Sequence, residues 1–186
     1  VGSVYTGNYA VAMDWKKDHD PQNRLIVLDT GAASGRLAVI VLAAARRLTE
    51  TRNMDQTIDF AKRAVEACEE YVFLEKLEYL ALGGRLSKTS AFFGDMLKMK
   101  PVISPQPDGA KKVAVARSRN DQIKLAHEKL AVALQPESLA LIMLEYSDNR
   151  AQVEEFGGSV RKLYPKAEII LQPLSLTSGA HMGPGT

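Results

Sequence analysis

The stretch YVFLEKLEYLALGGRLSK, residues 71–88, marks the point where the pattern of this chain changes, and it decides how the fold is interpreted. Its first four residues, 71–74, form a short apolar run that predicts a strand. Residues 77–82 predict a short helix, and Gly83-Gly84 ends it because glycine commonly follows a helix C-terminus. Before this stretch the sequence predicts alternating strand and helix, and after it the sequence predicts a hairpin together with further helices and strands. We therefore place a domain boundary between residues 70 and 71.

Before this boundary the pattern is typical of an α/β layer. Residues 25–29 (LIVLD) are a continuous apolar run of the kind found in buried parallel strands. Helices are predicted at 8–18, 35–51 and 54–70, with Ser34 and Asn53 as candidate caps of the second and third. Alternation of strand and helix favours stacked layers. The sequence thus predicts that residues 1–70 form a partial parallel α/β domain.

After the boundary, residues 71–186 predict an α+β domain with a mixed sheet. Extended segments at 102–105 and 113–116 flank the turn sequence Pro107-Asp108-Gly109, which predicts a hairpin. The other expected elements are helices at 87–99, 122–134 and 150–164, the last broken or bent near Gly157-Gly158, and strands at 138–146 and 167–171.

Composition excludes several classes of protein. The 186 residues are 46% hydrophobic, enough for a substantial core and too apolar for global disorder. A formal net charge of +2 and 6% aromatic residues disfavour nucleic-acid binding. Cys68 is the one cysteine, so neither a disulfide framework nor a cysteine metal cluster is expected, and a cytoplasmic location fits best.

No segment predicts secretion or membrane insertion. The longest apolar run, 37–45, is too short to span a bilayer, and no signal peptide opens the chain. The chain begins at Val1 in a loop that enters a helix, with no strand before it. We therefore expect an N-terminal part to be missing from it.

The last eight residues, GAHMGPGT, are the strongest candidate for a ligand site. Glycines at 179, 183 and 185 permit a close approach to the backbone, and Pro184 stiffens the bend around His181. Histidine is the side chain whose charge changes most readily near neutral pH. The segment predicts either a histidine fixed on a turn that binds a ligand or an ordinary polar tail, and both interpretations stay open.

Three further positions carry polar groups suited to an anion. Arg85 follows the glycine pair and offers the forked donors that recognise carboxylate or phosphate, although on this segment alone a solvated arginine after a helix cap is the favoured interpretation. Ser3 and Thr6 stand before the helix expected at 8–18, where hydroxyl and free N–H groups suit an anion or act as plain caps. Arg117, just after the predicted hairpin, indicates either a docking patch or a solvated edge.

Motifs of nucleotide binding and catalysis do not occur. Asp29-Thr30-Gly31 follows the first predicted strand as in an α/β crevice, but no glycine-rich nucleotide loop follows it. We find neither a nucleophile elbow nor the spacing of a zinc protease site.

Taken in order, these segments resemble the DegV family. Residues 71–88 are similar to that family's strand, LEYL helix and GGRIS turn, and 91–102 to its next helix and KPI strand. Residues 180–186 resemble its HxGPGT turn. Residues 3–9 resemble its SSxLSGTY segment with departures: Gly2 and Thr6 stand in place of serines, and Asn8 in place of threonine.

The resemblance implies a two-domain DegV-like fold with a long-chain fatty acid between domains 1–70 and 71–186. It implies a carrier without catalytic residues or a cofactor, which presents the fatty-acid carboxylate to a separate ATP-dependent, DAK-like kinase. The head-group residues carried over are Ser3, Thr6, Arg85 and His181, and Arg117 would contact the kinase or the phosphate. The resemblance also implies an N-terminal strand-and-helix region of several dozen residues that contributes to the lipid tunnel, and this is the part that we expect to be missing here.

Two other function classes remain as alternatives. A small hydrolase or transferase would use His181 as general base, but it needs a nucleophile that the sequence does not nominate. A purely structural interaction domain would need neither a ligand nor a nucleophile. Lipid extracted from the purified protein would separate the carrier from both.

Overall fold

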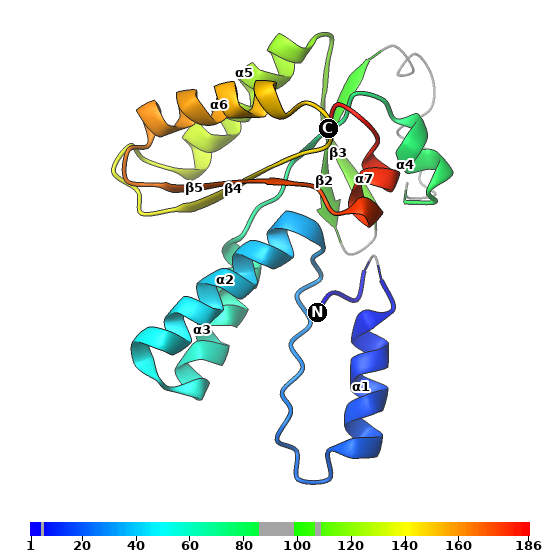
Figure 1. The fold of residues 1–186 in the computed structure, drawn as a ribbon, viewed down its shortest axis with the longest axis vertical. Helices are drawn as coiled ribbons and strands as arrows, with labels where there is room; N and C mark the ends of the chain where they lie inside the picture. Colours follow the sequence, from blue (N-terminus) through cyan, green and yellow to red (C-terminus); the bar gives the residue numbers. More distant parts are fainter. Residues whose placement is uncertain (5, 86–98, 107–108) are drawn as a thin grey trace. The chain divides into compact units, whose positions relative to one another are not determined.

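The structure is a computed structural model that describes residues 1–4, 6–85, 99–106 and 109–186 (Figure 1). It divides into two compact units, the first built mainly of Val1–Glu69 and the second of Glu70–Pro105 and Gly109–Thr186. Each unit is described by itself. The helix expected at 87–99 lies almost wholly outside the described residues, as do Pro107 and Asp108 of the hairpin turn.

The first unit contains three helices: α1 (Asn8–His19), α2 (Ser34–Thr51) and α3 (Met54–Ala67). Asn53 caps α3 as predicted, because its side chain accepts the Gln56 N–H at 3.0 Å. Helices α2 and α3 pack together, burying Ile40 and Ala61. The predicted cap of α2 is wrong: Ser34 is already the first helical residue, and its predecessor Ala33 makes no side-chain cap.

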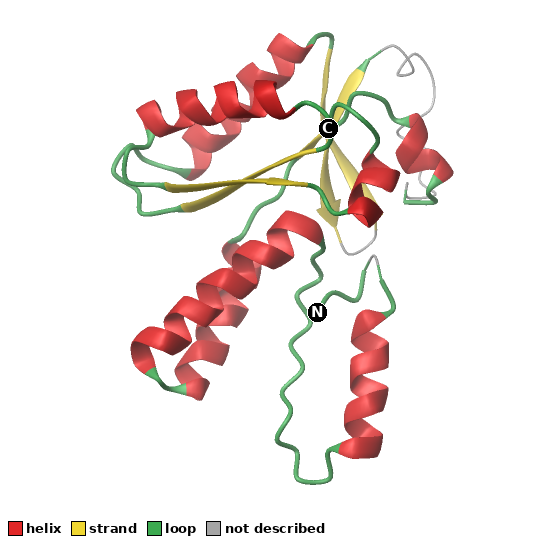
Figure 2. Ribbon diagram, viewed as in Figure 1, coloured by secondary structure: helices red, strands yellow, loops and turns green. Residues whose placement is uncertain are grey.

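The predicted strand at 25–29 is also wrong. The segment is drawn as a loop (Figure 2). Its backbone bonds a loop side chain and the N-terminus rather than a strand: the Leu25 N–H donates to Asp20 Oδ2 at 2.6 Å, and the Val1 N-terminus donates to the Leu28 carbonyl at 3.2 Å. A strand needs a neighbouring strand to satisfy its peptide groups, and Leu25 and Ile26 remain 38% and 54% exposed. The apolar run therefore predicted burial that this structure does not supply.

The described residues of the second unit form two small sheets, so its mixture of helices and strands is confirmed, but the single mixed sheet that was predicted is wrong. In the first sheet, β1 (Val72–Phe73) pairs antiparallel with β2 (Lys100–Gln106), Val72 facing Ile103, and β3 (Gly109–Ala116) lies on the other side of β2. In the second, β4 (Leu141–Tyr146) and β5 (Glu168–Pro173) run parallel, with Leu141 opposite Glu168. Both predicted hairpin strands thus form neighbouring strands.

Outside residues 86–98, the helices of this unit are α4 (Glu78–Leu82), α5 (Arg119–Ala133), α6 (Arg150–Leu163) and α7 (Leu176–Met182). A capping box of Ser118 and Asp121 starts α5 earlier than predicted. The helix α6 runs without interruption through Gly157-Gly158, so the break expected there is wrong. Gly157 instead allows close packing: a Cβ there would lie 3.2 Å from the Leu144 side chain on β4.

The core of the second unit anchors the elements that carry the candidate site. Leu74, Leu80 and Ile103 are at most 1% exposed and form its centre with Val72 and Ala110. Met182, the last residue of α7, packs against this cluster together with Leu77. Burial of Leu80 and Met182 therefore holds α4 and the end of α7 on the same core.

Candidate functional site

The glycine pair after α4 forms a tight helix end that folds Arg85 back on itself. The Arg85 N–H donates to the Leu80 carbonyl at 3.1 Å, and Gly84 has a φ of +67°, so the predicted glycine cap is confirmed. The Arg85 guanidinium donates from Nη1 to the Gly83 carbonyl at 2.6 Å, and the residue is half-buried. Arg85 is thus a half-buried arginine after a helix cap, with its guanidinium folded onto the turn.

Helix α7 brings His181 to the same turn. His181 lies in the last turn of this helix rather than on a free glycine turn as predicted, because the helix extends to Met182 before Gly183 ends it. A Cβ placed on Gly83 would lie 2.3 Å from His181 Nδ1, so the imidazole packs directly on the glycine backbone. Arg85 and His181, far apart in the sequence, thus meet at Gly83.

We expect Gly83→Ala to lower the free energy of unfolding by about 1–3 kcal/mol, because the added methyl group must displace the imidazole. Denaturant unfolding measures this. Gly158→Ala is the matched control, since a Cβ there meets nothing within 4 Å and the residue lies inside α6. An equal response of the two variants would contradict the close contact between Gly83 and His181.

Gly183 makes a second contact between α7 and α4. Its φ is +82°, and a Cβ there would lie 2.3 Å from Cδ2 of the Tyr79 ring. The Tyr79 ring therefore lies on the peptide backbone directly after α7. Figure 1 shows α7 beside α4, in agreement with these two contacts.

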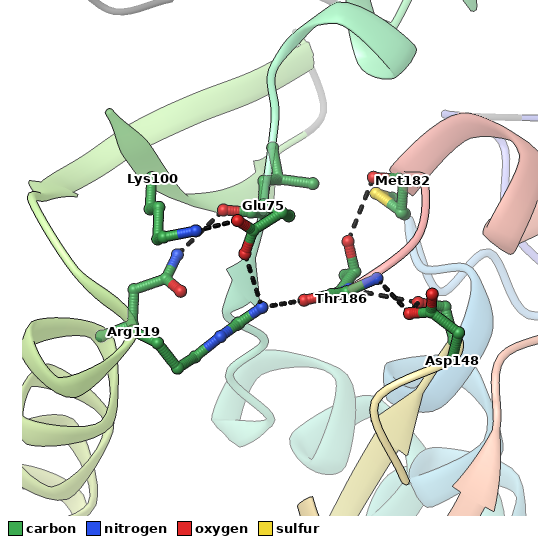
Figure 3. Close-up of polar contacts among 10 residues, drawn as sticks. Glu75, Lys100, Arg119, Asp148, Met182 and Thr186 are labelled. Atoms are coloured by element: carbon green, nitrogen blue, oxygen red, sulfur yellow. Dashed lines mark hydrogen bonds and ion pairs between the residues drawn. The ribbon is translucent and has the colours of Figure 1, made fainter. Parts of the chain in front are cut away.

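A cluster of charged side chains surrounds the turn that follows α7 (Figure 3). Glu75 forms ion pairs with Lys100, the first residue of β2, and with Arg119, the first of α5, the latter at 2.9 Å. Arg119 also donates to the Gly185 carbonyl. Burial lowers the pKa of Arg119 against the opposing effect of Asp148, and burial together with repulsion from Arg119 lowers the pKa of Lys100.

The loop after β4 holds the opposite side of the same turn. Asp148 Oδ1 accepts the Gly185 N–H at 2.5 Å, and Ser147 Oγ accepts the Thr186 N–H at 3.1 Å. Thr186 also bonds back to α7, its hydroxyl donating to the Met182 carbonyl at 3.0 Å. The peptide groups after His181 are thus fixed from two sides.

Sequence analysis did not nominate Glu75, Lys100, Arg119 or Asp148. Their positions in the chain offered one clue to such a site. Each residue stands at the start of a strand or helix or shortly after a strand. Charged residues at such points are common on protein surfaces, and only the folded chain brings these four to one turn.

Ser3 and Thr6 lie in the first unit and have local partners. The Ser3 N–H donates to Asp29 Oδ1 at 3.0 Å, and the Thr6 hydroxyl donates to the Gly2 carbonyl at 3.2 Å. Burial alone would raise the pKa of Asp29, but hydrogen bonds from Ser3 and Gly31 hold it below its ordinary value. Thr6 Oγ1 also accepts the N–H of Asn8, the first residue of α1, at 3.4 Å, as the capping interpretation of Thr6 expects.

The departure at Gly2 has a structural cause. Gly2 is buried, and a Cβ there would lie 2.2 Å from the Ala32 carbonyl oxygen. A serine at this position would require the backbone near Ala32 to move. The contact between the backbones at Gly2 and Ala32 therefore explains why this chain has glycine where the family that it resembles has serine.

Arg117 lies directly after β3, as expected, and is exposed. Its backbone N–H donates to Asp121 Oδ2 at 3.3 Å, beside the capping box of α5. Among the described residues, no helix is long and apolar enough to cross a membrane. The same residues contain no group of three histidine, cysteine or acidic side chains placed to hold a metal ion.

Comparison with known proteins assigns the chain. The sequence model described as "Uncharacterised protein, DegV family" matches residues 1–186, the whole chain. The chain belongs to the DegV family. The glycine turn at 83–85 and the histidine turn at 181–186, which meet in the structure, are thus features of a DegV chain.

The relatives and the solved structures match almost the whole of this chain. A DegV domain-containing protein of Streptococcus pyogenes is 27% identical over 99% of this chain, which spans 65% of that relative. A structure described as fatty acid binding of a DegV family protein, from Thermus thermophilus, superposes with a TM-score of 0.85 at 23% identity, covering 97% of this chain and 64% of that one. The Streptococcus pneumoniae Fatty Acid Kinase B3 protein loaded with linoleic acid gives 0.81 at 19%, covering 97% and 65%.

Proposed function

We propose that this protein binds a long-chain fatty acid and presents its carboxylate to a separate, ATP-dependent DAK-like kinase. The observation that carries the proposal is the meeting of Arg85 and His181 at Gly83. A carboxylate taken out of water needs charge pairing and hydrogen bonds. The Arg85 guanidinium and the His181 imidazole, which both contact Gly83, would supply the charge pairing and the hydrogen bonds. Ser3 and Thr6 are the proposed hydroxyl donors.

The comparisons support the ligand class. The Thermus thermophilus relative is described as binding fatty acid, and the Streptococcus pneumoniae relative is a kinase-system protein loaded with linoleic acid. In this proposal the acyl tail lies between domains 1–70 and 71–186. Each buried CH₂ group contributes about 0.8 kcal/mol, so the tail dominates affinity and the head group fixes orientation.

The hydrolase or transferase alternative lacks support in the described residues, where His181 has no hydroxyl or thiol recorded within hydrogen-bond distance. Calorimetry of the delipidated protein tests the proposal directly. We expect saturable binding of a long-chain acid at roughly one per chain, dominated by tail burial. Failure to bind any acid of this class would refute the carrier.

We expect Arg117→Ala to slow acyl-phosphate formation by the protein and its kinase while leaving fatty-acid affinity nearly unchanged. Arg117 is exposed at the end of β3, outside the buried core, so its position suits docking of the kinase or contact with the phosphate. The two measurements are acyl-phosphate production by the reconstituted pair and lipid binding by the same variant. Equal losses in both would place Arg117 in the lipid site instead.

A further inference from the structure

The turn after α7 is fastened through both peptide groups of one residue. The Gly185 carbonyl accepts from Arg119, and the Gly185 N–H donates to Asp148. Gly185 is only four residues beyond His181, and the Met182 carbonyl is joined to the same turn by the Thr186 hydroxyl. A displacement of Gly185 therefore moves the end of α7 that carries His181.

Arg119 is the side chain best placed to transmit such a displacement. Its Nη2 atom has two hydrogens; one bonds Glu75 Oε2 and the other the Gly185 carbonyl. Glu75 is in turn paired with Lys100, so the guanidinium ties the turn to the end of β1 and the start of β2. The Arg119 and Lys100 side chains are 23% and 22% exposed, which limits competition from water.

His181 has little freedom on the other side. Its Nδ1 lies 2.3 Å from the point where a Cβ on Gly83 would stand, so the imidazole is already in contact with the glycine backbone. The ring therefore packs on the α4 glycine turn, while the charged cluster holds the backbone of the turn that follows it, through Gly185.

We propose that Arg119 is a positioning residue that, together with Glu75 and Asp148, fixes the orientation of the His181 imidazole toward the ligand head group. This inference rests on the proposed function for the identity of the head group. It assigns Arg119 no contact with the fatty acid. The ammonium of a lysine is a compact point charge and reproduces the forked bridge only in part.

The test compares Arg119→Met, Arg119→Lys and the control Lys124→Met, an exposed cation on the same helix. Calorimetry on the delipidated protein gives the affinity for palmitic acid and for hexadecanol, which share a tail and differ in head group. We expect the acid-over-alcohol ratio to fall about tenfold in Arg119→Met and less in Arg119→Lys. The ratio should not change in Lys124→Met, and hexadecanol affinity should stay constant throughout.

Equal loss of both affinities, or an unchanged ratio, would overturn the inference and leave Arg119 a merely structural residue. If Arg119→Met does not fold, Arg119→Lys carries the same comparison. If the wild-type protein binds neither compound, the proposed function fails. Nuclear magnetic resonance of the ligand-free protein then tests the positioning role of Arg119 on its own. The His181 ring signals should then shift in the Arg119 variants and stay in place in Lys124→Met, and unmoved signals in all variants would refute the positioning role.

Discussion

Gly183→Ala is expected to lower the free energy of unfolding by roughly 2–5 kcal/mol, among the largest effects of a single methyl group in this chain. Two costs add. An L-residue in the left-handed region is strained by about 1–2 kcal/mol, and the φ here is +82°. The new Cβ would also lie 2.3 Å from the Tyr79 ring, and overpacking of this kind costs about 1–3 kcal/mol.

Gly179→Ala provides the control for this change. Gly179 lies in α7, the helix that ends before Gly183, and a Cβ at Gly179 would meet nothing within 4 Å. Alanine is the better helix former by about 0.5–1 kcal/mol, so this variant should be neutral or slightly more stable. Denaturant unfolding of both variants measures the difference. If Gly183→Ala proved as stable as Gly179→Ala, the packing of Tyr79 on the turn would be wrong.

His181→Ala should raise the dissociation constant for a long-chain fatty acid roughly 10- to 150-fold, the equivalent of one charge-assisted hydrogen bond of about 1.5–3 kcal/mol. The imidazole packs on the turn that holds Arg85, so its loss leaves the guanidinium as the remaining donor to a carboxylate there. Tail burial should survive, since it does not depend on the imidazole. Calorimetry of the delipidated variant measures the change.

His19→Ala is the corresponding control, because this histidine is exposed on α1, where its ring stacks on Trp15. It should bind fatty acid like the wild-type protein. An unchanged dissociation constant in His181→Ala would remove His181 from the head-group site. A loss of binding of the uncharged alcohol as well would indicate a collapsed fold rather than a lost hydrogen bond.

Local sequence signals were sufficient for most elements of the second unit. The glycine pair at 83–84 ends α4, the apolar run at 138–146 contains β4, and the run at 167–171 overlaps most of β5. These predictions succeeded because caps and apolar periodicity act within a few residues. Asn53 was identified as the cap of α3 for the same reason.

Long-range contacts explain the errors. The run at 25–29 has the composition of a buried strand, but strand formation depends on a partner strand that the described residues do not provide. Gly157 looked like a helix breaker, whereas it permits contact between α6 and Leu144. His181 was singled out correctly as a candidate, but its helix α7 was missed because LTSGAHM contains few strong helix formers.

The candidate site was predictable only in part. Motif resemblance nominated Arg85 and His181, and their meeting at Gly83 required the fold. The cluster of Glu75, Lys100 and Arg119 could not be predicted, because its members come from three elements and are joined only by tertiary packing. Ser3 and Thr6 lie in the other unit, so their share in the head-group site stays a prediction.

Mass spectrometry of lipid extracted from the purified, denatured protein tests the central claim most directly. The account predicts a long-chain fatty acid, about C14–C18, at roughly one per chain, because a tail of this length gains the most from burial. The amount should fall in His181→Ala relative to His19→Ala. Protein that carries no fatty acid, and takes up none when purified in its presence, would contradict the account.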